Sequence, residues 1–139
     1  MEYKVIDNTY VVRLDVGDEI MESLTVLCKK ENIKAATVQG LGATDNVTVG
    51  YYSTVANRYF SRTFNEQFEI ISLNGNISVK DNEPYLHLHI ALSDENYTFF
   101  GGHLNNAVIS ITAEIFVVKL DGIIGRRVNE KTNLNIFDV

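Results

Sequence analysis

The sequence predicts an α+β fold, with one main helix and a largely antiparallel sheet of seven to eight strands. One segment, about residues 18–32, has apolar residues at helical spacing. Most of the remaining chain consists of short runs rich in β-branched and aromatic residues, separated by Asn, Asp and Gly. The 139 residues, 45% of them hydrophobic, suffice for one core, and no linker or repeat divides them. We therefore expect a single domain over residues 1–139.

The helix is expected to begin at Asp18, whose side chain can accept a hydrogen bond from the first turn. Asn32 suits the left-handed position that ends a helix. The predicted buried stripe consists of Ile20, Leu24, Leu27 and Cys28. Cys28 is therefore interpreted as a core residue and not as a reactive thiol.

The expected strands follow one another mostly as hairpins, because short polar turns separate them. They are residues 10–13, 35–41, 47–52, 58–64, 68–79, 85–92, 98–104 and 108–120. One short helix cannot cover so many strands. We therefore expect part of the sheet to be buried against another subunit.

The charge and the cysteine content of the chain indicate which partners it can bind and in which cellular compartment we expect it. Twelve basic and eighteen acidic residues give a net charge of −6, without a basic cluster, so direct binding of nucleic acid is not expected. A lone cysteine cannot form an intramolecular disulfide. No secretory signal and no apolar stretch of about 20 residues is present, so we expect a cytoplasmic protein without a membrane partner.

The three histidines of the chain, His87, His89 and His103, lie within seventeen residues. The even positions from 86 to 92 carry Leu or Ile, as on the buried face of a strand. His87 and His89 then share the opposite face, with Cα atoms about 7 Å apart. Imidazoles at this spacing can bind one metal ion.

Residues 85–104 are predicted to form a hairpin whose turn is centred on Glu95. This register places His103 opposite His87 and Gly101 opposite His89. Three imidazoles would then form a platform for Zn²⁺, with Fe, Ni, Co or Cu as alternatives. Gly101-Gly102 would permit a bulge or the close approach of a ligand. The alternative interpretation is that these are ordinary surface or structural histidines.

Two further residues are candidates for catalysis. Glu114 is a carboxylate within an apolar strand, and could act as ligand, as a partner that orients a histidine, or as general base. Its alternative is a solvent-facing position. Arg13, in another apolar strand, could hold an anionic substrate, although an ordinary carboxylate partner is the competing interpretation.

These motifs resemble the PPC domain (plants and prokaryotes conserved domain) in its stand-alone prokaryotic form, over nearly the whole chain. The most specific motifs are His87-Leu88-His89, Gly101-Gly102-His103-Leu104 and Thr112-Ala113-Glu114. The resemblance implies an α+β fold, a homotrimer and a metal-binding histidine cluster. The wider fold group resembles acetolactate decarboxylase, whose zinc also lies on an HxH motif plus a later His, which implies His87, His89 and His103 as ligands here.

Three functional hypotheses follow. The first is a homotrimer whose three-histidine site, with zinc, binds or converts a small polar or anionic metabolite. The second is a DNA-associated regulatory or scaffold module that acts through trimerisation and protein partners, without catalysis. The third is a trimer in which the histidines only line a subunit interface.

Overall fold

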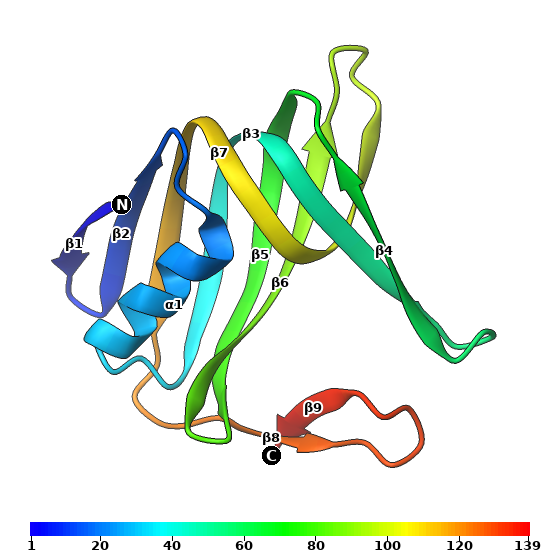
Figure 1. The fold of residues 1–139 in the computed structure, drawn as a ribbon. Helices are drawn as coiled ribbons and strands as arrows, with labels where there is room; N and C mark the ends of the chain where they lie inside the picture. The colour runs from blue at the N-terminus through cyan, green and yellow to red at the C-terminus, as the bar shows by residue number, and fades with distance from the viewer.

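The computed structural model describes residues 1–139 and confirms the α+β class (Figure 1). It contains one helix, α1 (Ile20–Lys30). The nine strands are β1 (Glu2–Ile6), β2 (Thr9–Asp15), β3 (Ala36–Ser53), β4 (Arg58–Phe64), β5 (Phe68–Lys80), β6 (Glu83–Ser93), β7 (Phe99–Lys119), β8 (Gly125–Val128) and β9 (Asn135–Asp138). All strand pairs are antiparallel except β5 with β8.

Two strands are longer than the sequence predicted. The runs expected at 35–41 and 47–52 merge into β3 (Ala36–Ser53), and those expected at 98–104 and 108–120 merge into β7 (Phe99–Lys119). The polar residues between these runs do not end the strands, because register shifts around Gly42, Thr44 and Asn46 absorb the bend. The eight expected runs therefore form six strands, and the short strands β1, β8 and β9, which were not expected, bring the total to nine.

Four strands form a closed circuit. β3 pairs with β5 and β7, and β6 pairs with both β5 and β7. Two hairpins extend from this circuit: β3 and β4 project as an arm, and β8 and β9 lie beside the end of β5 (Figure 1). Residues 89–93 of β6 are therefore paired on both sides, whereas residues 83–88, including His87, pair with β5 alone.

Helix α1 packs one apolar face against the sheet, as predicted. Its buried residues are Ile20, Leu24, Leu27 and Cys28. The predicted cap is wrong by one residue: Glu19 accepts the hydrogen bond from the Glu22 amide, while Asp18 binds the Met1 ammonium at 2.7 Å. Asn32 has the predicted left-handed conformation, with φ 49°. At 11 residues, α1 is neither long nor apolar enough to cross a membrane.

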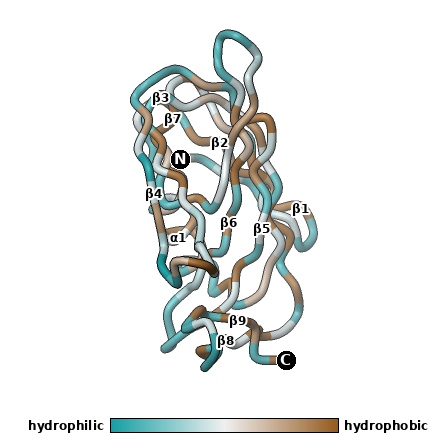
Figure 2. Tube along the Cα trace, turned by 90° about the vertical axis from the view of Figure 1, so that its right-hand side faces the viewer, coloured by the Kyte–Doolittle hydropathy of each residue, from teal (hydrophilic) through white to brown (hydrophobic).

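Strand β6 positions the histidines through its alternation of residues, which Figure 2 shows along the chain trace. Its even positions, Leu86, Leu88, Ile90 and Leu92, are all buried in the core. Successive side chains of a strand point to opposite faces. His87 and His89 are thereby held on the outer face of the sheet.

Candidate metal site

The three histidine rings converge on one point. Ring centroids lie 5.3 Å apart for His87 and His89, 5.2 Å for His87 and His103, and 5.4 Å for His89 and His103. One ring nitrogen from each lies within 4.8 Å of the other two. The prediction that three imidazoles from neighbouring strands meet is confirmed.

The predicted register of the hairpin is wrong by two residues. His103 lies opposite His89, not His87, and Gly101 lies opposite Ala91. The cause is the turn, in which the Asp94 carboxylate accepts hydrogen bonds from the amides of Asn96 and Thr98, at 2.9 and 2.8 Å. A shift of two keeps every side chain on its face. The three histidines therefore still share a face.

Gly101 and Gly102 allow close packing between strands, and neither a bulge nor a ligand accounts for them. A Cβ on Gly101 would lie 2.0 Å from the Ile90 carbonyl oxygen, and one on Gly102 would lie 2.7 Å from the Gly50 carbonyl oxygen. No side chain fits at these distances. The two glycines allow β7 to approach β6 and β3 closely, which brings His103 to the other two rings.

The site holds two of its histidines neutral. Burial lowers the pKa of His87 to about 4, with smaller contributions from His103, Arg126 and His89. Burial also lowers the pKa of His103, and His89 adds to the effect. Neutral imidazole is the form that binds a metal ion, because its lone pair is free.

The ring nitrogens fit a divalent transition metal. The neighbouring polar side chains bond elsewhere, Tyr59 to Asn105 and Asn76 to Arg126, so they do not occupy the rings. Tetrahedral zinc with bonds of 2.0–2.1 Å needs nitrogens ~3.4 Å apart. The nitrogens of the three rings lie within 4.8 Å of one another, so they must approach by up to about 1.4 Å to bind one zinc ion. Three imidazoles also leave a fourth position for a ligand.

Neutral side chains surround the cluster, and Glu114, the carboxylate considered as a partner of the histidines, is not among them. Asn74 lies opposite His89 and Asn76 opposite His87 on β5. The ring of Tyr59 lies edge-on to His103, with centroids 6.0 Å apart. Sequence reasoning missed these residues, because only the sheet topology brings β4 and β5 to the histidines.

Glu114 and Arg13 lie apart from the histidines. The three histidines form the candidate metal-binding group without Glu114, which lies opposite Arg13 and Leu41 and is exposed. Arg13 forms ion pairs with Glu2 at 2.9 Å and Asp15 at 3.0 Å, as its competing interpretation expected. Within one protomer the structure does not bring either residue to the cluster, so their catalytic roles stay a prediction.

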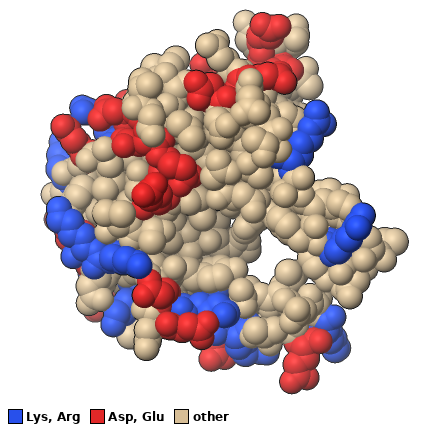
Figure 3. Space-filling view, in the orientation of Figure 1, with Lys and Arg blue, Asp and Glu red and all other residues tan.

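The two projecting hairpins flank the histidine cluster. Tyr59 of β4 contacts His103 on one side. On the other side, Arg126 of β8 bonds to Asn76, next to His87. Figure 3 shows the molecule hollowed between these two hairpins. A small ligand at the histidines would therefore lie between the arm and the C-terminal hairpin.

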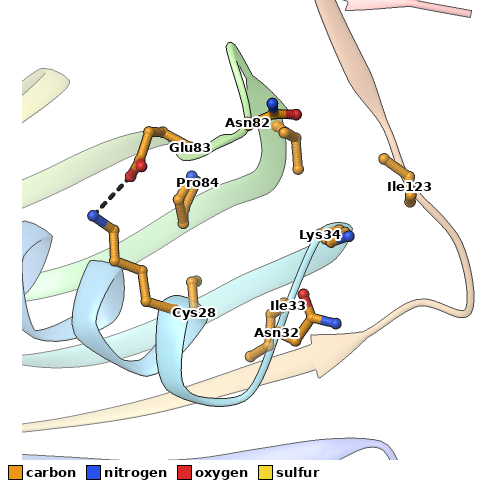
Figure 4. Close-up of a pocket in the computed structure, with 10 residues that line it drawn as sticks. Cys28, Asn32, Ile33, Lys34, Asn82, Glu83, Pro84 and Ile123 are labelled. Atoms are coloured by element: carbon orange, nitrogen blue, oxygen red, sulfur yellow. Dashed lines mark ion pairs between the residues drawn. The ribbon is translucent and has the colours of Figure 1, made fainter.

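A separate pocket of about 440 Å³ lies where the end of α1 meets the turn between β5 and β6 (Figure 4). Cys28 lines it, and the Lys29–Glu83 ion pair of 2.7 Å crosses its edge. Burial raises the pKa of the Cys28 thiol to about 12. Cys28 is confirmed as a core residue, and its thiol stays protonated at neutral pH.

The metal-free protein is expected to lose stability as the pH falls from about 6.5 towards 4. In this window the unfolded chain protonates His87, whose pKa is then near 6.5, whereas the folded chain does not. Urea unfolding at pH 7 and pH 4.5 should show a smaller loss for His87→Asn than for the wild type. Carboxylates contribute equally to both proteins, so an identical loss would contradict the low pKa.

Comparison with solved structures gives close matches over the whole chain. A candidate DNA-binding protein from Bacteroides thetaiotaomicron is 35% identical, with a TM-score of 0.95, over 99% of this chain and 96% of that one. A metal-containing protein from Archaeoglobus fulgidus is 31% identical, with a TM-score of 0.89, over 99% and 97%. A plant- and prokaryote-conserved (PPC) protein from Pyrococcus horikoshii is 33% identical, with a TM-score of 0.88, over 99% and 95%.

A more distant match supports the expected fold group. A Staphylococcus aureus protein similar to α-acetolactate decarboxylase is 12% identical, with a TM-score of 0.56, over 83% of this chain and 53% of that one. At this identity the likeness concerns the fold alone. No curated protein matches the chain. The sequence model of the Plants and Prokaryotes Conserved (PCC) domain matches residues 1–121.

Proposed function

Because this chain belongs to the Plants and Prokaryotes Conserved (PCC) domain family, and because its three histidines converge, we propose that it is a cytoplasmic metal-binding protein. His87, His89 and His103 hold the ion, which is Zn²⁺ or another divalent transition metal. The protein binds or converts a small polar or anionic metabolite at this ion.

One observation carries the proposal. Three imidazole nitrogen donors, from two neighbouring strands of the sheet, lie within 4.8 Å of one another. Burial and the neighbouring histidines lower the pKa of His87 and of His103, so both rings are held in the neutral form that a metal ion binds. The relative from Archaeoglobus fulgidus, which is described as metal-containing, adds support.

The roles of the chain's own residues follow from their positions. β6 presents His87 and His89, β7 presents His103, and the strand pairing places the three side chains on one face of the sheet. Asn74 and Asn76 lie beside the rings as neutral polar groups that can hydrogen-bond to a ligand. A bound zinc ion supplies Lewis acidity, which polarises a carbonyl group or activates water.

Elemental analysis of tag-free protein, purified without added metal, tests the proposal. The wild type should contain about one metal ion per chain, and the variant His87→Ala plus His89→Ala less than about a tenth of that, because one remaining imidazole holds zinc weakly. Thr37→Ala, at an exposed position of β3, is the control and should retain the metal. The proposal would be contradicted if the wild type contained no metal, or if the double histidine variant contained as much metal as the wild type.

We also propose that the protein is a homotrimer. The number of copies comes from the family resemblance, and an exposed apolar surface supports association. Leu41, Ile71 and Phe116 are 56%, 50% and 49% exposed and line one groove of about 240 Å³ together with Glu114. A second copy of the chain would remove this surface from water.

The second candidate function is a DNA-associated regulatory or scaffold module. The Bacteroides thetaiotaomicron relative, described as a candidate DNA-binding protein, favours it. The net charge of −6 opposes direct contact with phosphates. A gel-shift experiment on an A·T-rich duplex at moderate salt separates the two: a metabolite-binding protein gives no shift, whereas a salt-sensitive shift would favour the second function.

A further inference from the structure

Arg126 of the C-terminal hairpin is held in place from several directions. Its Nε donates to Ser78 Oγ at 2.7 Å, one terminal nitrogen donates to Asn76 Oδ1 at 2.7 Å, and the other donates to the Asn135 carbonyl at 3.0 Å. The guanidinium carbon also lies 4.4 Å from the ring centroid of Tyr85 and 4.6 Å from that of Phe137. The side chain is therefore pre-organised, with little rotamer freedom left to lose.

This guanidinium lies next to the histidine cluster. Asn76, which it contacts, is the cross-strand partner of His87, and Ser78 is the partner of Tyr85. Directly opposed residues of antiparallel strands share a face of the sheet. Arg126 thus lies on the same face as the histidines, one side chain away from His87.

The positive charge of Arg126 has no carboxylate partner. The ion pairs of the structure involve other residues, including Arg127 of the same hairpin, which pairs with Asp138. Three neutral oxygens accept from Arg126. Since guanidinium carries five N–H donors, two remain for a ligand. A partly buried cation without a counter-charge attracts an anion.

We propose that Arg126 makes the histidine site specific for oxyanions, so that the ligand carries a carboxylate or a phosphate group. The inference rests on the proposed metal site and names the class of its ligand. The ligand's anionic group binds between the metal and Arg126, in the hollow beside the C-terminal hairpin. Residue 126 lies outside the match to the family model, so this specificity belongs to a part of the chain that the model does not describe.

Calorimetric titration of the zinc-loaded protein with inorganic phosphate, and separately with acetate, tests the proposal and distinguishes the two anions. Arg126→Met, which keeps length and apolar contact with Tyr85 and Phe137, should weaken binding of the preferred anion by about tenfold or more, since a charge-assisted hydrogen bond is lost. Arg126→Lys should fall between that variant and the wild type, because it keeps the charge but loses the planar geometry.

Arg127→Met is the matched control. Arg127 belongs to the same strand, and its side chain is 60% exposed, so its loss should leave anion affinity unchanged. Equal anion affinity in the wild type and Arg126→Met, with equal zinc content and unfolding temperature, would overturn the inference. An equal loss of anion affinity in Arg126→Met and Arg127→Met would also overturn the inference. The positive charge of the hairpin as a whole, and not Arg126 in particular, would then attract the anion.

Failure of the metal proposal has a separate signature. If the wild type contains no stoichiometric metal, phosphate and acetate are titrated into the metal-free protein while the Nε–Hε resonance of Arg126 is followed by NMR. A shift of that resonance that saturates, and that is larger than the shift of Arg127, supports anion binding at Arg126. No shift would overturn it.

Discussion

Replacement of Gly101 by Ala is expected to destabilise the protein strongly and to impair metal binding at the same time. The new Cβ would lie 2.0 Å from the Ile90 carbonyl oxygen and 3.1 Å from the Ala91 Cα, both backbone atoms that cannot turn aside. Strands β6 and β7 must then separate, at a cost of about 3 kcal/mol or more, the upper range for overpacked sites. Urea unfolding of the metal-free protein measures this loss.

The effect on the metal follows from the position of Gly101. His103 lies two residues further along β7 and meets His89 through the same strand pairing. Separation of the strands moves one ligand away from the other two, so zinc affinity should fall by at least about tenfold, the range seen when ligands are poorly oriented. Competition with a zinc-sensitive dye measures the affinity below the unfolding temperature.

Gly125→Ala is the matched control for this substitution. A Cβ on Gly125 would meet only the Asp138 Cβ, at 3.7 Å, an ordinary contact. This variant should keep both the stability and the zinc affinity of the wild type. If Gly101→Ala behaves like Gly125→Ala, the close approach of β6 and β7 does not determine the geometry of the site.

Replacement of Phe116 by Asp is expected to convert the proposed trimer into monomers. Phe116 is 49% exposed and lies at the groove shared with Leu41 and Ile71. A carboxylate buried without a partner in a subunit interface costs several kcal/mol, and Glu114 in the same groove adds repulsion. Light scattering during gel filtration should show a mass near 15.6 kDa, against about three times that value for the wild type.

Val26→Asp tests whether any new surface charge has this effect. Val26 is 51% exposed on helix α1, away from the groove, and its replacement should leave the assembly intact. A wild type that is monomeric at micromolar concentration would refute the trimer. A Phe116→Asp variant that remains a trimer would place the interface on another face.

The sequence predicted those features that depend on local periodicity. Leu86, Leu88, Ile90 and Leu92 alternate with polar residues, so the face occupied by His87 and His89 followed from a period of two. The buried stripe of α1 followed from a period of 3.6 in the same way. His103 meets this pair as long as the register of the hairpin is shifted by an even number of residues, because an even shift keeps each side chain on its face. The predicted register was wrong by two residues, so the three histidines still met.

Features that depend on distant partners could not be predicted. The register of the hairpin is set by the Asp94 side chain and its bonds to Asn96 and Thr98, and a sequence pattern does not reveal which turn residue bonds to the backbone. Arg126 approaches His87 only because β8 pairs with β5. The paired residues, Val79 and Gly125, are forty-six positions apart in the sequence. Glu114 seemed central because its neighbours are apolar, yet it lies on the outer face of β7.

The closed circuit of β3, β5, β6 and β7 restricts how this protein can associate with other chains. A strand that is hydrogen-bonded on both sides offers no free backbone groups for β-augmentation. Free edges remain along β1, β4 and β9, each of which has a single partner, and along residues 83–88 of β6, which pair with β5 alone. A partner strand therefore cannot add beside His89 or His103, whereas the edge of β6 beside His87 has no strand partner within the chain.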